Sequence, residues 1–128
     1  MSGKPGDELV AYLVDALAPL AAQPRRFFGG HALVARGVQF AFVSDGTVYL
    51  RTDLALAAEL ESLGSEPFRY KTKLREVRVA SYWSLPGTEL DDPEVLVGWA
   101  KRALRGLEEE RPRRQAKQHA RRRLDQGR

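Results

Sequence analysis

The sequence predicts one α+β domain, in which a single antiparallel five-stranded sheet carries helices packed on one face in the order α-βββ-α-ββ-α. Three observations support this class. Three segments repeat apolar residues at helical spacings of three and four, and five short segments are rich in β-branched and aromatic residues. The chain has 128 residues, of which 43% are hydrophobic and 30% charged, as expected for one globular domain.

The first expected element is an amphipathic helix that is capped by Asp7 and ends near Pro19. Its apolar stripe consists of Leu9, Tyr12, Leu13, Ala16, Leu17 and Leu20. Residues 1–6 are expected to form a disordered leader, and the sequence after them lacks the layout of a signal peptide. No segment approaches the roughly 18 apolar residues of a membrane span. We therefore expect a cytoplasmic protein without a membrane partner.

Three strands are expected next, over residues 32–36, 38–43 and 47–51. Asp45-Gly46 joins the last two, because this pair tolerates the positive φ that both central residues of a tight hairpin turn require. In the middle strand, regular alternation places Phe40 and Phe42 on one face of the sheet and Ala41 on the other.

A second helix follows the third expected strand. Asp53 is its predicted cap, and its buried stripe is expected to consist of Leu56, Leu60 and Leu63. Gly64 stands where a helix commonly ends in a left-handed residue.

A hairpin and a last helix complete the expected domain. The hairpin pairs residues 67–71 with residues 76–83, and residues 72–75 form its loop. Asp92 caps the last helix, a contribution of about 1 kcal/mol, and this helix runs to Glu110. The core is expected to include Leu13, Leu17, Phe40, Phe42, Leu60, Trp99 and Ala103.

The positive charge of the chain is concentrated at its end. The net charge is +4, but residues 1–100 carry ten Lys/Arg against thirteen Asp/Glu. Residues 111–128 carry eight Lys/Arg against one Asp and contain one large apolar side chain. We therefore expect a domain over residues 7–110 and a separate basic tail over residues 111–128.

The tail is a candidate nucleic-acid contact, because closely spaced cations suit a phosphate backbone. Its candidate residues are Arg111, Arg113, Arg114, Lys117, Arg121, Arg122 and Arg123. The tail has no aromatic side chain for base stacking, so the expected binding is weak and nonspecific, to DNA or RNA. The alternative is a solvated tail that only keeps the protein soluble.

No arrangement of residues in the sequence predicts an enzyme. The chain has no cysteine, and its two histidines, His31 and His119, have few acids nearby, so we expect no metal site and no cofactor. The serines lack a G-x-S-x-G elbow or an assembled triad. The pair Gly29-Gly30 matches no phosphate-binding pattern and is interpreted as a bend at the entry to the sheet.

Several short motifs carry a resemblance to a known family, and the principal ones are Arg25-Arg26-Phe27-Phe28-Gly29-Gly30, Asp45-Gly46-Thr47-Val48-Tyr49-Leu50-Arg51, Gly64-Ser65-Glu66-Pro67-Phe68-Arg69-Tyr70 and Ser81-Tyr82-Trp83-Ser84-Leu85-Pro86. With Asp92-Pro93-Glu94 and Trp99-Ala100, their order and spacing resemble the N-terminal domain of the TfoX/Sxy family over roughly residues 7–107. The family motif within the first of them comprises Arg26, Phe28, Gly29 and Gly30.

The resemblance implies a bacterial protein with a compact α+β domain similar to secretion-chaperone-like folds. Founding members of the family regulate competence genes together with a cyclic-AMP-responsive activator, and no catalytic residue or cofactor comes with the family. The chain departs from the pattern at Phe27, where the family usually has Met. Its basic tail also stands where full-length regulators carry a second, helical domain, so we expect a stand-alone N-terminal domain.

Two functions remain open at this point. The first is a non-enzymatic regulatory or accessory protein that contacts a protein partner, such as the transcription machinery, while the tail adds nonspecific affinity for nucleic acid. The second is a stand-alone protein-binding or dimerising module with no nucleic-acid role. The identity of the partner and the oligomeric state are not predicted.

Overall fold

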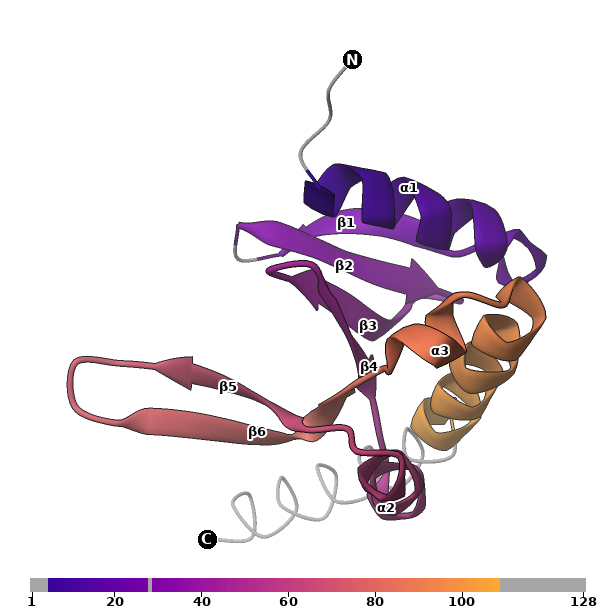
Figure 1. Cartoon of the computed structure of the whole chain (residues 1–128). Coiled ribbons are helices and arrows are strands. Elements are labelled where there is room, and N and C mark those ends of the chain that lie inside the picture. Colours follow the sequence, from indigo (N-terminus) through magenta and orange to yellow (C-terminus); the bar gives the residue numbers. More distant parts are fainter. Residues whose placement is uncertain (1–4, 28, 109–128) are drawn as a thin grey trace, which may run out of the picture.

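A computed structural model describes residues 5–27 and 29–108. Its elements are α1 (Pro5–Ala16), the 3-10 turn η1 (Ala18–Leu20), β1 (Gln23–Phe27), β2 (Gly30–Ala35), β3 (Val38–Ser44), β4 (Thr47–Arg51), α2 (Leu54–Ser62), β5 (Pro67–Lys71), β6 (Glu76–Ser84) and α3 (Gly87–Leu90). Residues 93–108 form a last helix, drawn in orange to yellow in Figure 1.

The strands form one open antiparallel sheet in the order β1-β2-β3-β4-β6-β5. The prediction of an α+β fold with an antiparallel sheet is confirmed, but the sheet has six strands, so the expected number of five is wrong. The additional strand is β1, whose residues are mostly exposed and include Pro24. Proline and charged side chains are typical of edge strands and hide the alternation on which a sequence-based assignment depends.

The turns and helix ends confirm most of the predicted local signals. Asp45 and Gly46 both have positive φ, 48° and 75°, as the two-residue turn requires. The Asp53 carboxylate accepts a hydrogen bond from the backbone N–H of Leu56 at 2.8 Å and caps α2. Asp92 likewise accepts from the N–H of Glu94 at 2.9 Å at the start of the last helix.

Two predicted helix details are wrong. Helix α1 begins at Pro5, so Asp7 lies in its first turn and not at its cap. Leu63 follows the last residue of α2 and is 49% exposed, although it was expected in the buried stripe. The neighbouring Gly64 has φ 89° and bends the chain toward β5, which turns Leu63 away from the core.

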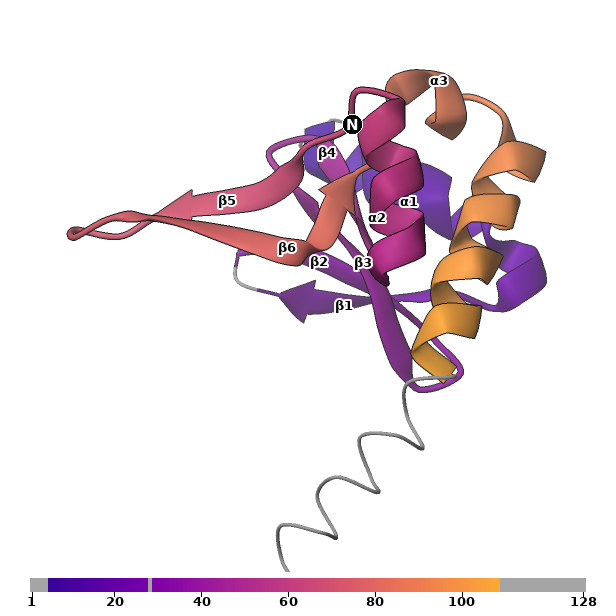
Figure 2. The ribbon, with the colours of Figure 1, turned by 90° about the horizontal axis from the view of Figure 1, so that it is seen from below.

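The helices pack on one face of the sheet and build the main hydrophobic core there. Figure 2 shows α1, α2 and the last helix gathered on the side away from the β5–β6 hairpin. All the buried helix residues described belong to this core. Among the predicted core residues, this cluster contains Leu13, Leu17, Phe40, Leu60, Trp99 and Ala103.

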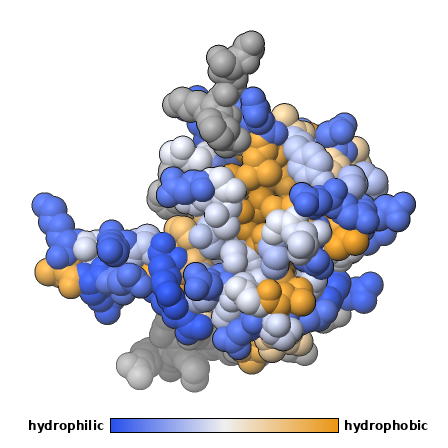
Figure 3. Space-filling model, viewed as in Figure 1, coloured by the Kyte–Doolittle hydropathy of each residue, from blue (hydrophilic) through white to orange (hydrophobic). Residues whose placement is uncertain are grey.

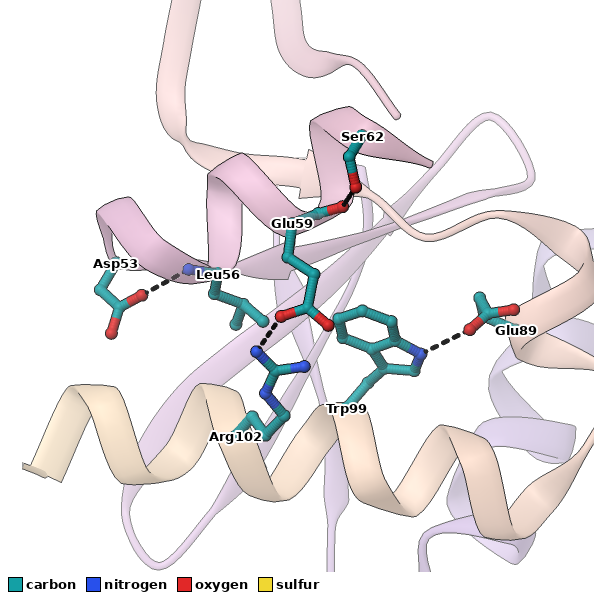
Figure 4. A network of polar contacts seen from close by, with 7 residues as sticks. All are labelled: Asp53, Leu56, Glu59, Ser62, Glu89, Trp99 and Arg102. Carbon is teal, nitrogen blue, oxygen red and sulfur yellow. Dashed lines mark hydrogen bonds and ion pairs between the residues drawn. The ribbon is translucent and has the colours of Figure 1, made fainter. Parts of the chain in front are cut away.

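A polar network fastens α2 and α3 to the last helix (Figure 4). The indole Nε1 of Trp99 donates to Glu89 at 3.1 Å, and the Arg102 guanidinium lies over the Trp99 ring, 5.1 Å from its centroid. Arg102 also donates to Glu59 on α2. That hydrogen bond is the main reason why the pKa of Glu59 lies below its ordinary value. Trp99 is therefore held by packing and by charged neighbours on two helices.

Candidate functional site

A second apolar cluster lies on the sheet face opposite the helices. Its buried members are Ala32, Phe42 and Tyr82, and Phe27, Tyr49, Phe68 and Val79 pack against them. No described helix residue belongs to this cluster. The domain therefore has apolar side chains on both faces of its sheet, and the buried residues of the described helices pack on only one of them.

A β-bulge in β3 creates this second cluster. Leu33 of β2 pairs with Ala41 and Val34 pairs with Gln39, so Phe40 has no partner between them. The extra residue places Phe40 and Ala41 toward the helices, and the strand then resumes its alternation. Phe42 consequently joins the open-face cluster, while Phe40 belongs to the main core. The prediction that Phe40 and Phe42 share a face is wrong, although both are buried as expected.

Phe42 is the centre of the cluster. Its ring centroid lies 5.3 Å from that of Phe27, 5.2 Å from Tyr49, and 4.8 Å from both Phe68 and Tyr82. Such pairs contribute about 0.5–1.5 kcal/mol each beyond their buried area. The four partners come from four different strands, so one side chain ties the two ends of the sheet together.

The cluster forms the floor of a half-open groove of about 990 Å³, which we call the aromatic groove. Phe42 and Tyr82 lie at its base. One wall comes from the end of the β1–β2 hairpin, with Phe27, Gly29, Gly30 and His31. The opposite wall comes from the β5–β6 hairpin, with Phe68, Tyr70 and Val79. Its volume is at the upper end of the range for ligand-binding cavities, about 300–1,000 Å³.

An irregularity in β6 positions the second wall. Pro67 pairs with Trp83, whereas the next residue, Phe68, pairs with Val79, so three residues of β6 have no partner on β5. The outer part of the hairpin can therefore leave the plane of the sheet. Figure 1 shows it projecting away from the last helix. Trp83 enters the main core, while Tyr82 joins the groove.

Polar side chains orient the ring of Tyr82 from the edge of the groove. Gln39 donates to the Tyr82 hydroxyl at 3.2 Å and accepts from Arg25 at 3.0 Å. The guanidinium of Arg51 lies 5.6 Å from the centroid of the same ring, within the range of a cation–π contact. These contacts restrict the orientation of the Tyr82 ring in the unliganded protein.

Tyr49 packs against the second cluster but is not among the residues that line the groove. Burial raises the pKa of its phenol above the ordinary value, and the negative charges of Asp45 and Glu66 raise it further. The neutral phenol is therefore the form that this environment favours.

The backbone geometry favours glycine at both family-motif positions that line the groove, Gly29 and Gly30. Gly29 has φ 80°, a conformation that other residues rarely adopt. A Cβ on Gly30 would lie 2.6 Å from the carbonyl oxygen of Val43 on β3, so only glycine allows this approach. Arg26 is exposed on β1 and is not among the groove-lining residues. Phe28 lies outside the described residues.

The tail residues named above, Arg111 to Arg123, also lie outside the described residues, so their role stays a prediction. The carboxylic acids and the imidazole that line the groove are Asp7, Asp45 and His31. In the described ranges no ion pair joins them, and no three His, Cys, Asp or Glu side chains are placed to hold a metal ion. The groove therefore offers a mainly aromatic and aliphatic contact area.

Sequence reasoning missed the aromatic groove, although one signal was present. In β4, Val48 and Leu50 point to the main core, so Tyr49 between them must lie on the other face. Phe68 and Tyr70 alternate with charged residues in the same manner. Aromatic residues on the supposedly polar face of several strands indicate that this face is not simply solvated.

The fold and this face define a small α+β domain whose sheet presents a preformed aromatic surface on the side opposite the main core of the described helices. Residues 15–107 match the family model of the TfoX N-terminal domain. The chain therefore belongs to the TfoX N-terminal domain family, which supports a regulatory or accessory role. A search among curated proteins finds no match. No described helix is long and apolar enough to cross a membrane.

Proposed function

We propose that this protein is a non-enzymatic regulatory or accessory protein that binds a segment of a partner protein in the aromatic groove. The observation that carries the proposal is the Phe42-centred groove of about 990 Å³, whose aromatic cluster contains no described helix residue and which α1 reaches only with Asp7. Aromatic residues are enriched at the centres of protein interfaces because they bury a large area at little cost in conformational entropy.

The exposed parts of the groove indicate the chemistry of the partner. Tyr70 is 47% exposed on the hairpin wall, and Phe68 and Val79 are half-buried beside it. Burying such surface stabilises a complex by about 25 cal/mol per Å² before ordering costs. The groove is lined by two hairpins and is half-open to solvent, which suits an extended peptide with apolar side chains better than an enclosed small molecule.

Selection from a random peptide library displayed on phage tests this proposal. The expected result is enrichment of peptides with aromatic or aliphatic anchors, which Tyr70→Asp weakens at least roughly tenfold because it places a charge in the apolar contact. Val95→Asp is the matched control, because Val95 is 38% exposed on the last helix, outside the groove. Absence of enrichment, or equal loss in both variants, would contradict the groove as the binding site.

The proposal that the protein is not an enzyme has its own test. The groove supplies His31 with two acids at its rim, and no hydrogen bond among the described residues joins them. Screens with hydrolase and transferase substrates should give rates at background. Activity that is lost in His31→Ala while the fold is retained would contradict this proposal.

A further inference from the structure

The β5–β6 hairpin concentrates the positive charge of the folded part of the chain. Residues 1–100 contain ten Lys/Arg, and half of these lie between the first and last residues of this hairpin. They are Arg69, Lys71, Lys73, Arg75 and Arg78. Glu76 is the only acid in the same stretch. The acidic total for residues 1–100 therefore includes a basic β5–β6 hairpin, which we call the basic arm, in addition to the basic tail.

The strand pairing separates this charge from the aromatic groove. Phe68 pairs with Val79 and Tyr70 with Val77, and paired residues share a face of the ribbon. The opposite face carries Arg69 paired with Arg78, and Lys71 paired with Glu76. Like charges directly opposite one another destabilise a ribbon. Each arginine has one partner among the described residues: Glu76 lies 3.8 Å from Arg69, and the Trp83 ring lies 5.7 Å from the Arg78 guanidinium. These two contacts offset the repulsion only in part, because both guanidinium charges remain on the same face of the ribbon.

The tip of the hairpin is a preformed turn with an exposed apolar residue. The Thr72 hydroxyl accepts from the backbone N–H groups of Leu74 and Arg75, and the N–H of Thr72 donates to the Arg75 carbonyl at 2.8 Å. Leu74 is 94% exposed between Lys73 and Arg75. Figure 3 shows the projecting arm as largely hydrophilic with an apolar spot at its end.

Protection of a sheet edge explains only part of this arrangement. Arg69 and Lys71 lie on β5, an edge strand, where charged side chains prevent association between sheets. Strand β6 pairs with β4 only at Tyr82–Ser84, so Arg78 also lies at an open edge of the outer hairpin. Edge protection does not explain Lys73 and Arg75, because both lie in the turn. An exposed leucine at the tip would favour association rather than prevent it.

We propose that the β5–β6 hairpin binds duplex DNA, with its Lys and Arg side chains on the phosphates and Leu74 against the bases. Two strands about 4.8 Å apart form a ribbon that fits the DNA major groove, which is about 12 Å wide. In the major groove, an apolar tip residue can contact thymine methyl groups while the cations neutralise the adjacent phosphates. This site is separate from the aromatic groove, and either proposal can fail without the other.

Charge-matched variants of the full chain test the phosphate contacts. We expect Lys73→Gln/Arg75→Gln to weaken binding of an unrelated 20-base-pair DNA duplex by roughly tenfold at low salt and to reduce the slope of log affinity against log salt by about 1.8. The control Lys101→Gln/Arg105→Gln removes the same charge from exposed positions of the last helix and should change the slope little. The tail is present in all variants, so equal losses in the two pairs would overturn the proposal.

Leu74 tests contact with the bases. Leu74→Ser should lower DNA affinity several-fold while leaving the salt slope unchanged, because no charge is removed. Leu54→Ser is the control, since Leu54 is 92% exposed on α2. Equal affinity of wild type and Leu74→Ser would overturn the base contact. Circular dichroism melts of all four variants should match the wild type, because the altered residues are exposed.

Two further ligands distinguish DNA from other polyanions. Duplex RNA has a deep, narrow major groove that does not admit a ribbon, so the hairpin variants should affect RNA binding less than DNA binding. Vesicles containing phosphatidylserine present negative charge without grooves. Binding of the arm to such vesicles with no hairpin-dependent DNA binding, or stronger hairpin dependence for RNA, would overturn the proposal.

Discussion

Phe40 and Phe42 are two residues apart on β3 and lie on opposite faces of the sheet. Regular alternation would place them on the same face, but the bulge opposite Leu33 and Val34 adds one residue to β3. The main core thus receives Phe40, and Phe42 becomes available as the centre of the aromatic groove. This one bulge therefore places Phe40 in the main core and Phe42 at the centre of the candidate binding surface.

Phe40 should contribute strongly to folding. Its side chain is 1% exposed within the main core, so we expect Phe40→Ala to lower the free energy of unfolding by about 3–5 kcal/mol. Tyr70→Ala, at a 47% exposed position, should change it by only about 0.5 kcal/mol. Urea denaturation followed by circular dichroism measures both. Similar losses in the two variants would show that Phe40 is not in the core.

Trp99 should stabilise the domain through packing more than through its hydrogen bond. It is 7% exposed and donates to Glu89, so Trp99→Ala should cost about 3–5 kcal/mol. Trp99→Phe keeps most of the apolar contact and should cost about 1–2 kcal/mol. Thermal and urea unfolding provide the comparison. An equal cost for Trp99→Ala and Trp99→Phe would contradict the larger contribution of packing.

Two glycine-to-alanine substitutions should have opposite effects. Gly30→Ala brings a Cβ against the Val43 carbonyl and should destabilise the domain by about 1–3 kcal/mol. Gly98 lies in the last helix with no atom close to an added Cβ, so Gly98→Ala should stabilise the domain by about 0.5–1 kcal/mol. The midpoints of urea unfolding measure both changes. Destabilisation by both substitutions would contradict the geometry at Gly98.

Tyr49 should make the domain sensitive to alkaline pH. Its folded-state pKa lies above the ordinary value of 10.0, chiefly because of burial. The corresponding stability is fully present below pH 10 and decreases as the pH rises toward the raised pKa, because the unfolded chain ionises first. Tyr49→Phe should reduce this alkaline decrease. Absorbance titration at 295 nm follows the phenol, and a Tyr49 midpoint at or below the ordinary value would contradict the prediction.

The tail should add nonspecific affinity for nucleic acid. If the seven cations from Arg111 to Arg123 all contacted duplex DNA, log affinity would fall with log salt at a slope of about −6. Partial engagement gives a smaller slope. Full-length protein and a chain ending at Glu110 should therefore differ in binding to unrelated duplexes and single strands at two salt concentrations. Equal binding by the two would remove the tail from the proposed function.

Much of the fold follows from local signals in the sequence. The Asp53 and Asp92 caps, the Asp45-Gly46 turn and the apolar stripe of the last helix depend on interactions within a few residues. The family resemblance also rests on short motifs and is confirmed by the family match over residues 15–107. The strand β1 was missed because an exposed edge strand with proline carries no apolar alternation.

The formation of the aromatic groove and the projection of the basic β5–β6 hairpin depend on the tertiary structure. The bulge at Phe40 depends on the register between β2 and β3, and the departure of the hairpin depends on three residues of β6 that have no partner on β5. Registers are set by long-range pairing and cannot be derived from one strand alone. The sequence by itself determined the domain class, the turns and the helix caps. Only the folded sheet determined which side chains would face one another on its open side.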